Sequence, residues 1–346
     1  MTIDIDIFEC RGGDILACDI VNKDGVKLVS RGTTLNDYII EKLKQFEINN
    51  VKVIYPPEYI KKNRYNYEKF EYGYKKSIQL VKDIVNDLST GKALNIDKVT
   101  SATELIYEHI HQNDICMLLN FLDRIKVTDE YTYLHSINVA FYCMLLAKWI
   151  DLSEYEIKKA VQAGLLHDIG KSRIPTSILN KPAKLTNEEF EIIKKHPVYG
   201  YDILSESEFS DLDIKRAVLL HHERINCSGY PFGISGEKIG LLARIVSIAD
   251  VYDAMTSNRV YKKKVTPFTT FEMFITEGYS GFDAYLTTEF INHMATYLIG
   301  SSVKLDNGEN GKIVYIPPNN LLCPIVYSNG EYIDMKKSNI RIIEMI

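Results

Sequence analysis

The stretch Glu156–Lys171, EIKKAVQAGLLHDIGK, determines how the rest of the chain is interpreted. Its apolar residues recur at helical spacing, and Ser153 with Glu156 forms a capping box where the predicted helix begins. The helix ends in an adjacent pair, His167 and Asp168. Two such side chains at one helix end can be directed into the same cavity, so the pair is a candidate metal-binding or catalytic element.

Further histidines and aspartates occur in apolar contexts on both sides of this stretch. They lie in HSINVAFYCMLLAKWI, FEIIKKHPVYG, DIKRAVLLHHE and LLARIVSIADVYDAM, and the residues concerned are His135, His196, His221, His222, Asp250 and Asp253. A single histidine on an apolar helix is more often a hydrogen-bonded core residue than a metal ligand. Asp250 and Asp253 share a helix face, however, and two buried carboxylates require a cation or a basic side chain opposite them.

The set as a whole favours a metal centre. Histidine and aspartate without cysteine suit divalent Fe, Mn, Ni or Zn better than thiolate chemistry does. A carboxylate such as Asp168 can bridge two ions. Two ions about 3.5–4 Å apart suit phosphoryl chemistry, because they activate a water and stabilise the leaving oxygen.

Composition places the chain among ordinary globular proteins. Its 346 residues predict two or three units, 46% are apolar, and the net charge of −5 gives no general attraction to DNA or to anionic membranes. The six cysteines are scattered, which argues against a disulfide framework and favours a cytoplasmic location. The N-terminus does not resemble a signal peptide, and the best apolar run, Val139–Ile150, is only 12 residues long, so no membrane insertion is expected.

The pattern along the chain predicts four segments. Residues 1–56 read as a small α+β module, with two strands around Lys23-Asp24-Gly25 and a helix that begins after Asn36. Residues 57–110 form a charged helical connector with interleaved tyrosines, for which a solvated helix is favoured over a nucleic-acid site. Residues 111–300 are helical, with a second capping box at Thr186 and Glu189, and residues 301–346 are a small β unit with Asn-Gly turns.

These residues resemble a known family. HDIGK at 167–171 matches the HD-x-G-K signature of the HD phosphohydrolases, and HHERINCSGYP at 221–231 resembles the HH-E-x-x-x-G-x-GYP signature of the HD-GYP subfamily. DEYTYLHSINVA, HPVYG and IADVYDAMTSNRVYKK follow the family's order and spacing. The resemblance covers about residues 110–290, and it implies a mainly α protein with an all-helical HD-GYP domain between the two smaller units.

The resemblance also implies an activity and a set of roles. The family hydrolyses cyclic di-GMP to pGpG or onward to GMP, by means of a hydroxide that bridges two metal ions. One ion would be held by His135, His167, Asp168 and Asp250, and the second by Asp168, His196, His221 and His222. Asp168 and Lys171 would be the catalytic residues, and the substrate contacts would be Lys171, Tyr230, Asp253, Arg259 and Lys262.

Two departures from the family pattern are informative. Some members have a glutamate four residues before the first histidine and hold a third ion, but this chain has Tyr131 there. We therefore expect two divalent ions, with Fe or Mn favoured and Ni or Zn also compatible. Asn226 and Cys227 stand where the family more often has Asp-Gly or Asn-Gly, so Cys227 would be strained if its φ is positive.

Other functions remain open at this stage. The chain could bind cyclic di-GMP, or a diguanylate cyclase through its GYP loop, with little turnover. It could also be an HD hydrolase of another cyclic dinucleotide, whereas the GYP motif argues against a nucleoside triphosphate. A homodimer through the connecting helices would be consistent with residues 57–110.

Overall fold

The computed structural model describes residues 2–8, 10, 14–21, 26–46, 48–54, 57–112, 115, 118–119, 122, 131–257, 264–276 and 281–346. The chain divides into two compact units, Met1–Lys69 and Phe70–Ile346. The boundary lies within the long helix α2, Pro57–Ser89. Within the described ranges, no helix combines a bilayer-spanning length with sufficient apolar character.

The first unit has short strands around one helix. Its elements before α2 are β1 (Thr2–Asp6), β2 (Ile20–Val21), β3 (Lys27–Val29), α1 (Asp37–Gln45) and β4 (Asn50–Ile54). Strands β1 and β4 pair antiparallel, as do β2 and β3. Helix α1 begins as predicted, because the side chain of Asn36 accepts a hydrogen bond from the backbone N–H of Ile39 at 2.8 Å. The predicted Lys23-Asp24-Gly25 turn lies outside the described residues.

The second unit is mainly helical, as the sequence predicts. After α2 its helices are α3 (Ile96–Gln112), α5 (Tyr131–Trp149), α6 (Glu154–Leu166), η1 (Ile169–Arg173), α7 (Thr176–Leu179), α8 (Asn187–Ile193), α9 (His196–Glu206), α10 (Leu212–Leu220), η2 (Gly236–Lys238), α11 (Leu241–Thr256), α12 (Pro267–Thr276) and α14 (Ala284–Tyr297). Both predicted capping boxes are present, Ser153 with Glu156 at the start of α6 and Thr186 with Glu189 at the start of α8. The two reciprocal hydrogen bonds of each box satisfy backbone groups that would otherwise lack partners.

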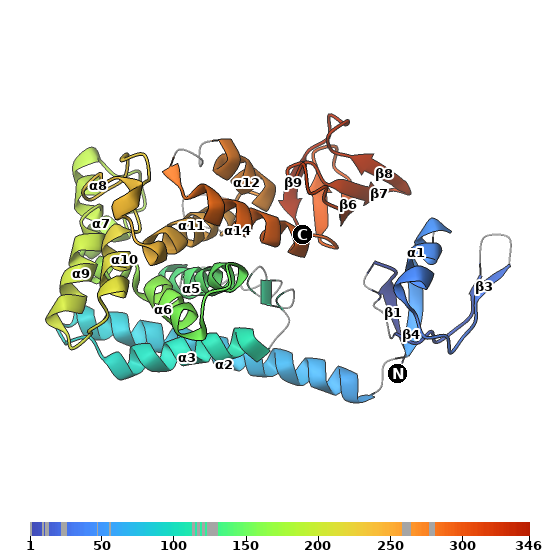
Figure 1. Ribbon diagram of the computed structural model, residues 1–346, viewed down its shortest axis with the longest axis horizontal. Helices are drawn as coiled ribbons and strands as arrows, with labels where there is room; N and C mark the ends of the chain where they lie inside the picture. Colours follow the sequence, from blue (N-terminus) through green and yellow to red (C-terminus); the bar gives the residue numbers. More distant parts are fainter. Residues whose placement is uncertain are drawn as a thin grey trace. The chain divides into compact units, whose positions relative to one another are not determined.

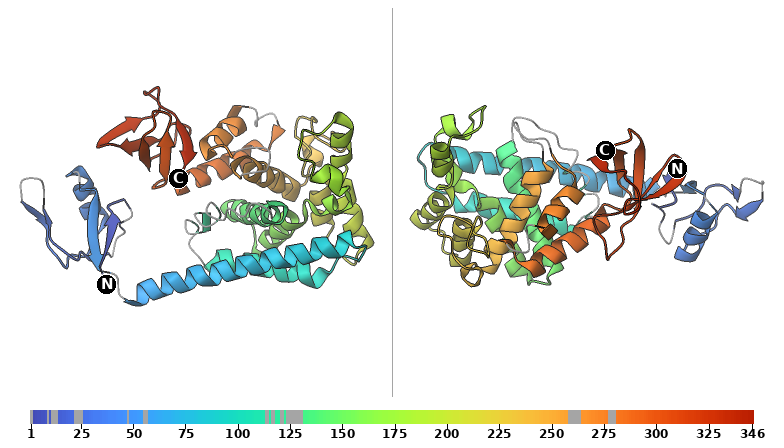
Figure 2. Two further views of the ribbon diagram at one scale, coloured as in Figure 1. Left: turned by 180° about the vertical axis from the view of Figure 1, so that it is seen from behind. Right: turned by 90° about the horizontal axis from the view of Figure 1, so that it is seen from above.

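Helix α5 lies at the centre of this helical part. Figure 1 shows α5 and α6 between α11 on one side and α3 on the other, and Figure 2 shows the same helices from behind. From Ile137 to Ala147 nearly every side chain of α5 is buried, which explains why the helix is apolar around its whole circumference. Close packing of α5 against α6 depends on Gly164, because a Cβ there would be 2.8 Å from the Cα of Ala140.

The C-terminal residues form the predicted β unit. Its antiparallel sheet has the order β8-β7-β6-β5-β9, with the bounds β5 (Ser302–Leu305), β6 (Asn310–Tyr315), β7 (Ile325–Ser328), β8 (Glu331–Asp334) and β9 (Ile342–Met345). Val303, Ile313 and Val326 are buried on this sheet. The predicted Asn-Gly turn between β7 and β8 is confirmed, since Asn329 and Gly330 both have positive φ, as tight hairpin turns of this type require.

Candidate metal centre

The histidines and aspartates singled out in the sequence meet in the second unit. His135 is in α5, His167 and Asp168 follow α6, His196 is the first residue of α9, His221 and His222 follow α10, and Asp250 is in α11. All but His222 are buried, with 0–7% of their surface exposed, and His222 is half-buried. Sequence positions more than a hundred residues apart therefore converge on one polar cluster inside an apolar bundle.

Their ligand atoms form two groups. One group is His135, His167 and Asp250, and the other is Asp168, His196, His221 and His222; within each group the candidate ligand atoms lie within 4.8 Å of one another. The Nε2 atoms of His135 and His167 are 3.3 Å apart, and those of His196 and His221 are also 3.3 Å apart. These distances are short enough for a single ion to contact both members of each pair.

Asp168 faces both groups. Its Oδ2 lies 3.3 Å from Nε2 of His167 and 3.6 Å from Nε2 of His135, and its Oδ1 lies 3.2 Å from Nε2 of His196. The side chain is directed here because η1 packs tightly on α9. A methyl group on Gly170 would collide with the carbonyl oxygen of His196, so glycine at this position of the HDIGK stretch permits the approach.

The tautomers of three histidines follow from their partners. Nδ1 of His167, His196 and His221 each lies 2.7–2.8 Å from the backbone carbonyl oxygen three residues earlier. A carbonyl oxygen only accepts hydrogen bonds, so each Nδ1 carries a proton and donates it. When such a ring is neutral, its Nε2 atom presents a lone pair toward the cluster, which is the form that binds metal.

Burial keeps most of these rings neutral. It lowers the pKa of His196 to about 4 and that of His222 to about 3, and it holds the pKa of His221 well below its usual value. His135 differs. Burial lowers its pKa, but hydrogen bonds to Asp250 and Asp253 outweigh this and raise the pKa to about 9.

The residues present fit a pair of divalent cations. Among the described residues, the buried Oδ1 of Asp168 accepts no hydrogen bond, although it lies 3.2 Å from a histidine nitrogen. The short Nε2–Nε2 distance between His196 and His221 likewise brings lone pairs together without a proton between them. An orphaned carboxylate oxygen facing unprotonated imidazoles is costly to bury unless a cation lies between them.

Of the residues predicted to contact substrate, Lys171 and Tyr230 lie at the metal cluster. Nζ of Lys171 lies 2.5 Å from Oδ2 of Asp168, and the ring of Tyr230 stacks on His222 with centroids 4.6 Å apart. Asp253 is 1% exposed and lies behind His135, whose Nδ1 is 2.7 Å from its Oδ2. This position favours orientation of His135 over the predicted substrate contact. Arg259 and Lys262, and the side chain of Tyr131, lie outside the part of the chain that the structure describes.

Two functional elements were missed at the level of sequence. Asn138 donates from Nδ2 to Oδ1 of Asp253 at 2.9 Å. Glu223, 2% exposed, accepts hydrogen bonds from the backbone N–H groups of Phe232, Gly233 and Ile234 and so holds the GYP loop. A signal existed for each: Asn138 is a polar residue on the His135 face of an apolar helix, and Glu223 directly follows the histidine pair.

The GYP loop also contains the predicted strained position. Cys227 has a φ of 65°, in the region where a Cβ is unfavourable. Its backbone N–H donates to the carbonyl of Arg224 at 2.9 Å, so the left-handed residue closes a tight turn. The condition under which the sequence predicts strain at Cys227, a positive φ, is therefore met.

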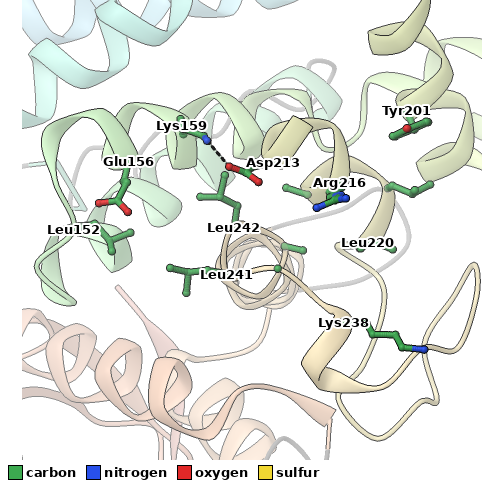
Figure 3. A pocket seen from close by; sticks show the side chains of 14 residues that line it. Leu152, Glu156, Lys159, Tyr201, Asp213, Arg216, Leu220, Lys238, Leu241 and Leu242 are labelled. Carbon is green, nitrogen blue, oxygen red and sulfur yellow. Dashed lines mark hydrogen bonds and ion pairs between the residues drawn. The ribbon is translucent and has the colours of Figure 1, made fainter. Parts of the chain in front are cut away.

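A cavity in this unit adjoins the metal cluster. A cavity of about 420 Å³ is bounded by Asp168 and Lys171 and by residues of α2, α5 and α7, including Tyr133 and Ser136. A larger cavity of about 660 Å³ is lined by residues of α6, α9, α10 and α11, and Figure 3 shows Lys159 paired with Asp213 beside it. The predicted site residues do not line the larger cavity, so size alone does not indicate the reactive centre.

The sequence is similar to known proteins. Residues 123–286 match the HD domain family. A cyclic di-GMP phosphodiesterase of Pseudomonas aeruginosa is 36% identical over 248 residues, which cover 71% of this chain and 59% of that protein. A 3′3′-cGAMP-specific phosphodiesterase of Vibrio cholerae is 36% identical over 170 residues, or 49% of this chain and 30% of that protein. The chain thus spans less than two thirds of the length of either relative.

A solved structure shows the same fold. The HDGYP protein Bd1817 from Bdellovibrio bacteriovorus superposes with a TM-score of 0.50 and 14% sequence identity. The match covers 85% of this chain and 99% of that one. At this identity the likeness concerns the fold and carries no information about substrate.

Proposed function

The chain is an HD-domain protein of the HD-GYP type, and from this premise we propose that it is a metal-dependent phosphodiesterase that hydrolyses cyclic di-GMP. The observation that carries the proposal is the buried Oδ1 of Asp168, which lacks a hydrogen bond in the described structure while its carboxylate faces both histidine groups. A carboxylate in this position suits a bridging ligand between two ions. Two ions suit cleavage of a phosphodiester better than they suit most other hydrolyses.

We assign the ligands as follows. His135, His167 and Asp250 would hold one ion, His196, His221 and His222 the other, and Asp168 would contribute an oxygen to each. We propose Fe or Mn as the metals, and nitrogen and oxygen ligands without sulfur are also compatible with Ni or Zn. When bound, the ions would supply Lewis-acid activation of water and neutralise charge at phosphorus.

The protein's own groups would bind and orient the substrate. Lys171 lies at the edge of the cluster beside Asp168, where its ammonium would contact a phosphate oxygen and offset the charge that develops there. We propose that Arg259 and Lys262 hold further phosphate oxygens. Tyr230 is stacked on His222. Its ring would cover one side of the substrate and exclude water from the ring nitrogens of His222.

The cavity of about 420 Å³ supports a nucleotide substrate. It adjoins Asp168 and Lys171, and Tyr133, Ser136 and Asn180 are among the residues that line it. An aromatic ring beside hydroxyl and amide groups can stack on a purine and hydrogen-bond to its edges. We propose that this cavity receives one base of the cyclic dinucleotide.

A specific observation also supports 3′3′-cGAMP as a second candidate substrate. The relative from Vibrio cholerae is named for 3′3′-cGAMP, and it is as similar in percentage identity as the Pseudomonas aeruginosa protein. The two substrates differ at one purine. Discrimination between them would depend on the hydrogen-bonding groups of the base cavity, where an unpaired polar group is costly.

The proposal is tested by turnover. The full chain, loaded anaerobically with Fe(II) or Mn(II), is incubated separately with cyclic di-GMP, 3′3′-cGAMP and GTP, and the products are separated by chromatography. We expect pGpG or GMP from cyclic di-GMP and no product from the His167→Ala variant. Cleavage of 3′3′-cGAMP alone would show that 3′3′-cGAMP is the substrate instead of cyclic di-GMP. Binding of cyclic di-GMP without cleavage would show that the protein is a binding module and not a phosphodiesterase.

Three expectations from the sequence stay predictions. Phe232 in the GYP loop is 59% exposed, which is compatible with a protein contact such as a diguanylate cyclase. A homodimer through residues 57–110 and a cytoplasmic location also await direct measurement. None of them affects the assignment of the metal ligands.

A further inference from the structure

His135 is held differently from its neighbours in the metal centre. His167, His196 and His221 donate from Nδ1 to a carbonyl oxygen three residues earlier in their own segment. Their orientation is therefore fixed locally. Nδ1 of His135 instead lies 2.7 Å from Oδ2 of Asp253, a residue 118 positions later in α11, so its orientation depends on tertiary packing.

The second oxygen of Asp253 continues the contact. It accepts hydrogen bonds at 2.9 Å from Nδ2 of Asn138 and at 2.9 Å from Oγ of Ser257. A carboxylate only accepts, so the amide of Asn138 must turn its NH₂ group toward Asp253. Its oxygen then points away, toward α2.

Tyr74 of α2 completes the contact. Its hydroxyl donates to Oδ1 of Asn138 at 2.8 Å, across 64 residues of sequence. The residue is 2% exposed, and its ring packs against Phe70 and Phe141 with centroids 6.0 Å away in both cases. Burial raises the pKa of the Tyr74 hydroxyl, which therefore keeps the proton that it donates.

Each bond in this series fixes the direction of the next. Tyr74 donates to Asn138, Asn138 donates to Asp253, and Asp253 accepts from Nδ1 of His135. Nε2 of His135 is consequently directed toward His167 and Asp250, at 3.3 Å and 3.1 Å. We call these four residues the Tyr74 relay.

We propose that Tyr74 and Asn138 are positioning residues of the metal centre, which make ion binding at the His135 group depend on how α2 packs against α5. The proposal rests on the two-ion site of the proposed function. It adds that α2, the helix that leads from the first unit into the second, contributes directly to the affinity of one ion and not of the other. The His196 group has no member of the relay among its ligand atoms.

The test uses Mn(II) alone as the probe. Free Mn(II) is counted by electron paramagnetic resonance while the metal-free full chain is titrated, which gives two dissociation constants without any measurement of activity. Tyr74→Phe removes the hydroxyl and keeps the ring between Phe70 and Phe141. Loss of a direct outer partner of a ligand costs about 10–100-fold in affinity, and for this more remote hydroxyl we expect about 3–10-fold at one site and no change at the other.

The matched control is Tyr72→Phe. Tyr72 lies on the same helix but is 71% exposed, so removal of its hydroxyl should leave both constants unchanged. Asn138→Ala provides a second variant that interrupts the relay at another atom. It should weaken the same site as Tyr74→Phe, because the orientation of Asp253 is lost in both.

A double-mutant cycle separates positioning from general destabilisation. Asp253→Asn breaks the relay next to His135, so adding Tyr74→Phe to it should cause no further loss of Mn(II) affinity. Additive losses, or unchanged constants in Tyr74→Phe, would overturn the proposal. If the wild-type chain binds no Mn(II), the two-ion function itself fails, whereas two bound ions with no effect of Tyr74→Phe refute the relay alone.

Discussion

Oδ1 of Asp168 lies 3.2 Å from Nε2 of His196, and no hydrogen bond joins them in the described structure. His196 uses its ring proton at Nδ1 to bind the carbonyl oxygen of Ile193, and burial keeps the ring neutral by lowering its pKa to about 4. Two lone pairs therefore face each other inside the protein. This arrangement is unfavourable without a cation and favourable with one, so stability and metal binding are linked.

The first prediction concerns a substitution at Asp168. In metal-free protein, Asp168→Asn should change the melting temperature little, because an amide NH₂ that can donate to His196 at the observed distance offsets the loss of the ion pair with Lys171. With Mn(II) in excess the wild-type chain should gain more stability than the variant, since it gains about 2.7 kcal/mol when the ion is present at 100 times its dissociation constant. Thermal unfolding with and without Mn(II) measures both differences. An equal rise in melting temperature of the two proteins on addition of Mn(II) would contradict the account of Asp168.

The second prediction concerns the division of the ligands into two groups. His135→Ala and His221→Ala each remove one ligand from a different group, so each variant should retain one tightly bound ion instead of two. Metal content after gel filtration is the measurement. His293→Ala is the matched control, because that ring lies outside both groups and stacks on Trp149 at 4.9 Å. Loss of both ions from either single variant would show one coupled site.

The third prediction concerns the buried Glu223 under the GYP loop. Glu223→Gln places an NH₂ group against backbone donors that now bind carboxylate oxygens at 2.6–3.2 Å. A buried donor left without an acceptor costs about 1–3 kcal/mol. We expect faster limited proteolysis near Phe232 and a higher KM with a smaller change in kcat. The exposed Glu237 supplies the control, and an equal effect of Glu237→Gln would remove the specific role of Glu223.

The fourth prediction concerns Cys227. A residue with a Cβ at a φ of 65° is strained by about 1–2 kcal/mol, which glycine avoids. Cys227→Gly should therefore raise the melting temperature by about 2–4 °C for each kcal/mol recovered in a unit of this size. Cys227→Ala keeps the Cβ and removes only the thiol. Equal gains from both substitutions would assign the effect to the thiol and not to the backbone.

Much of the helical framework was predictable because its signals are local. The capping boxes at Ser153 and Thr186 and the cap at Asn36 each depend on residues three positions apart, and all are present. The turn at Asn329-Gly330 is similarly local. The convergence of His167, Asp168 and the other candidate ligands could be predicted only when all of these residues were considered together. The sequence of one helix does not show which residues of other helices lie beside it.

The contacts that orient the ligands could not be predicted in the same way. The hydroxyl of Tyr74 meets Asn138 across 64 residues, and α2 has a charged pattern with many tyrosines that gives no reason to select one of them. Helical spacing correctly predicted that Asp253 and Asp250 share a helix face. It did not predict that Asp253 contacts Nδ1 of His135, on the side of the ring away from the other candidate ligands. Side-chain contacts of this kind depend on packing between helices.

The most direct measurement is cyclic di-GMP turnover as a function of Mn(II) equivalents added anaerobically to the metal-free full chain. Asp168 faces both ligand groups, so the proposed mechanism predicts that hydrolysis requires both ions. We predict that activity remains low at one equivalent, rises with the second and reaches a plateau at two. Full activity at one equivalent, a requirement for a third, or intact cyclic di-GMP at every equivalent would contradict the two-ion phosphodiesterase.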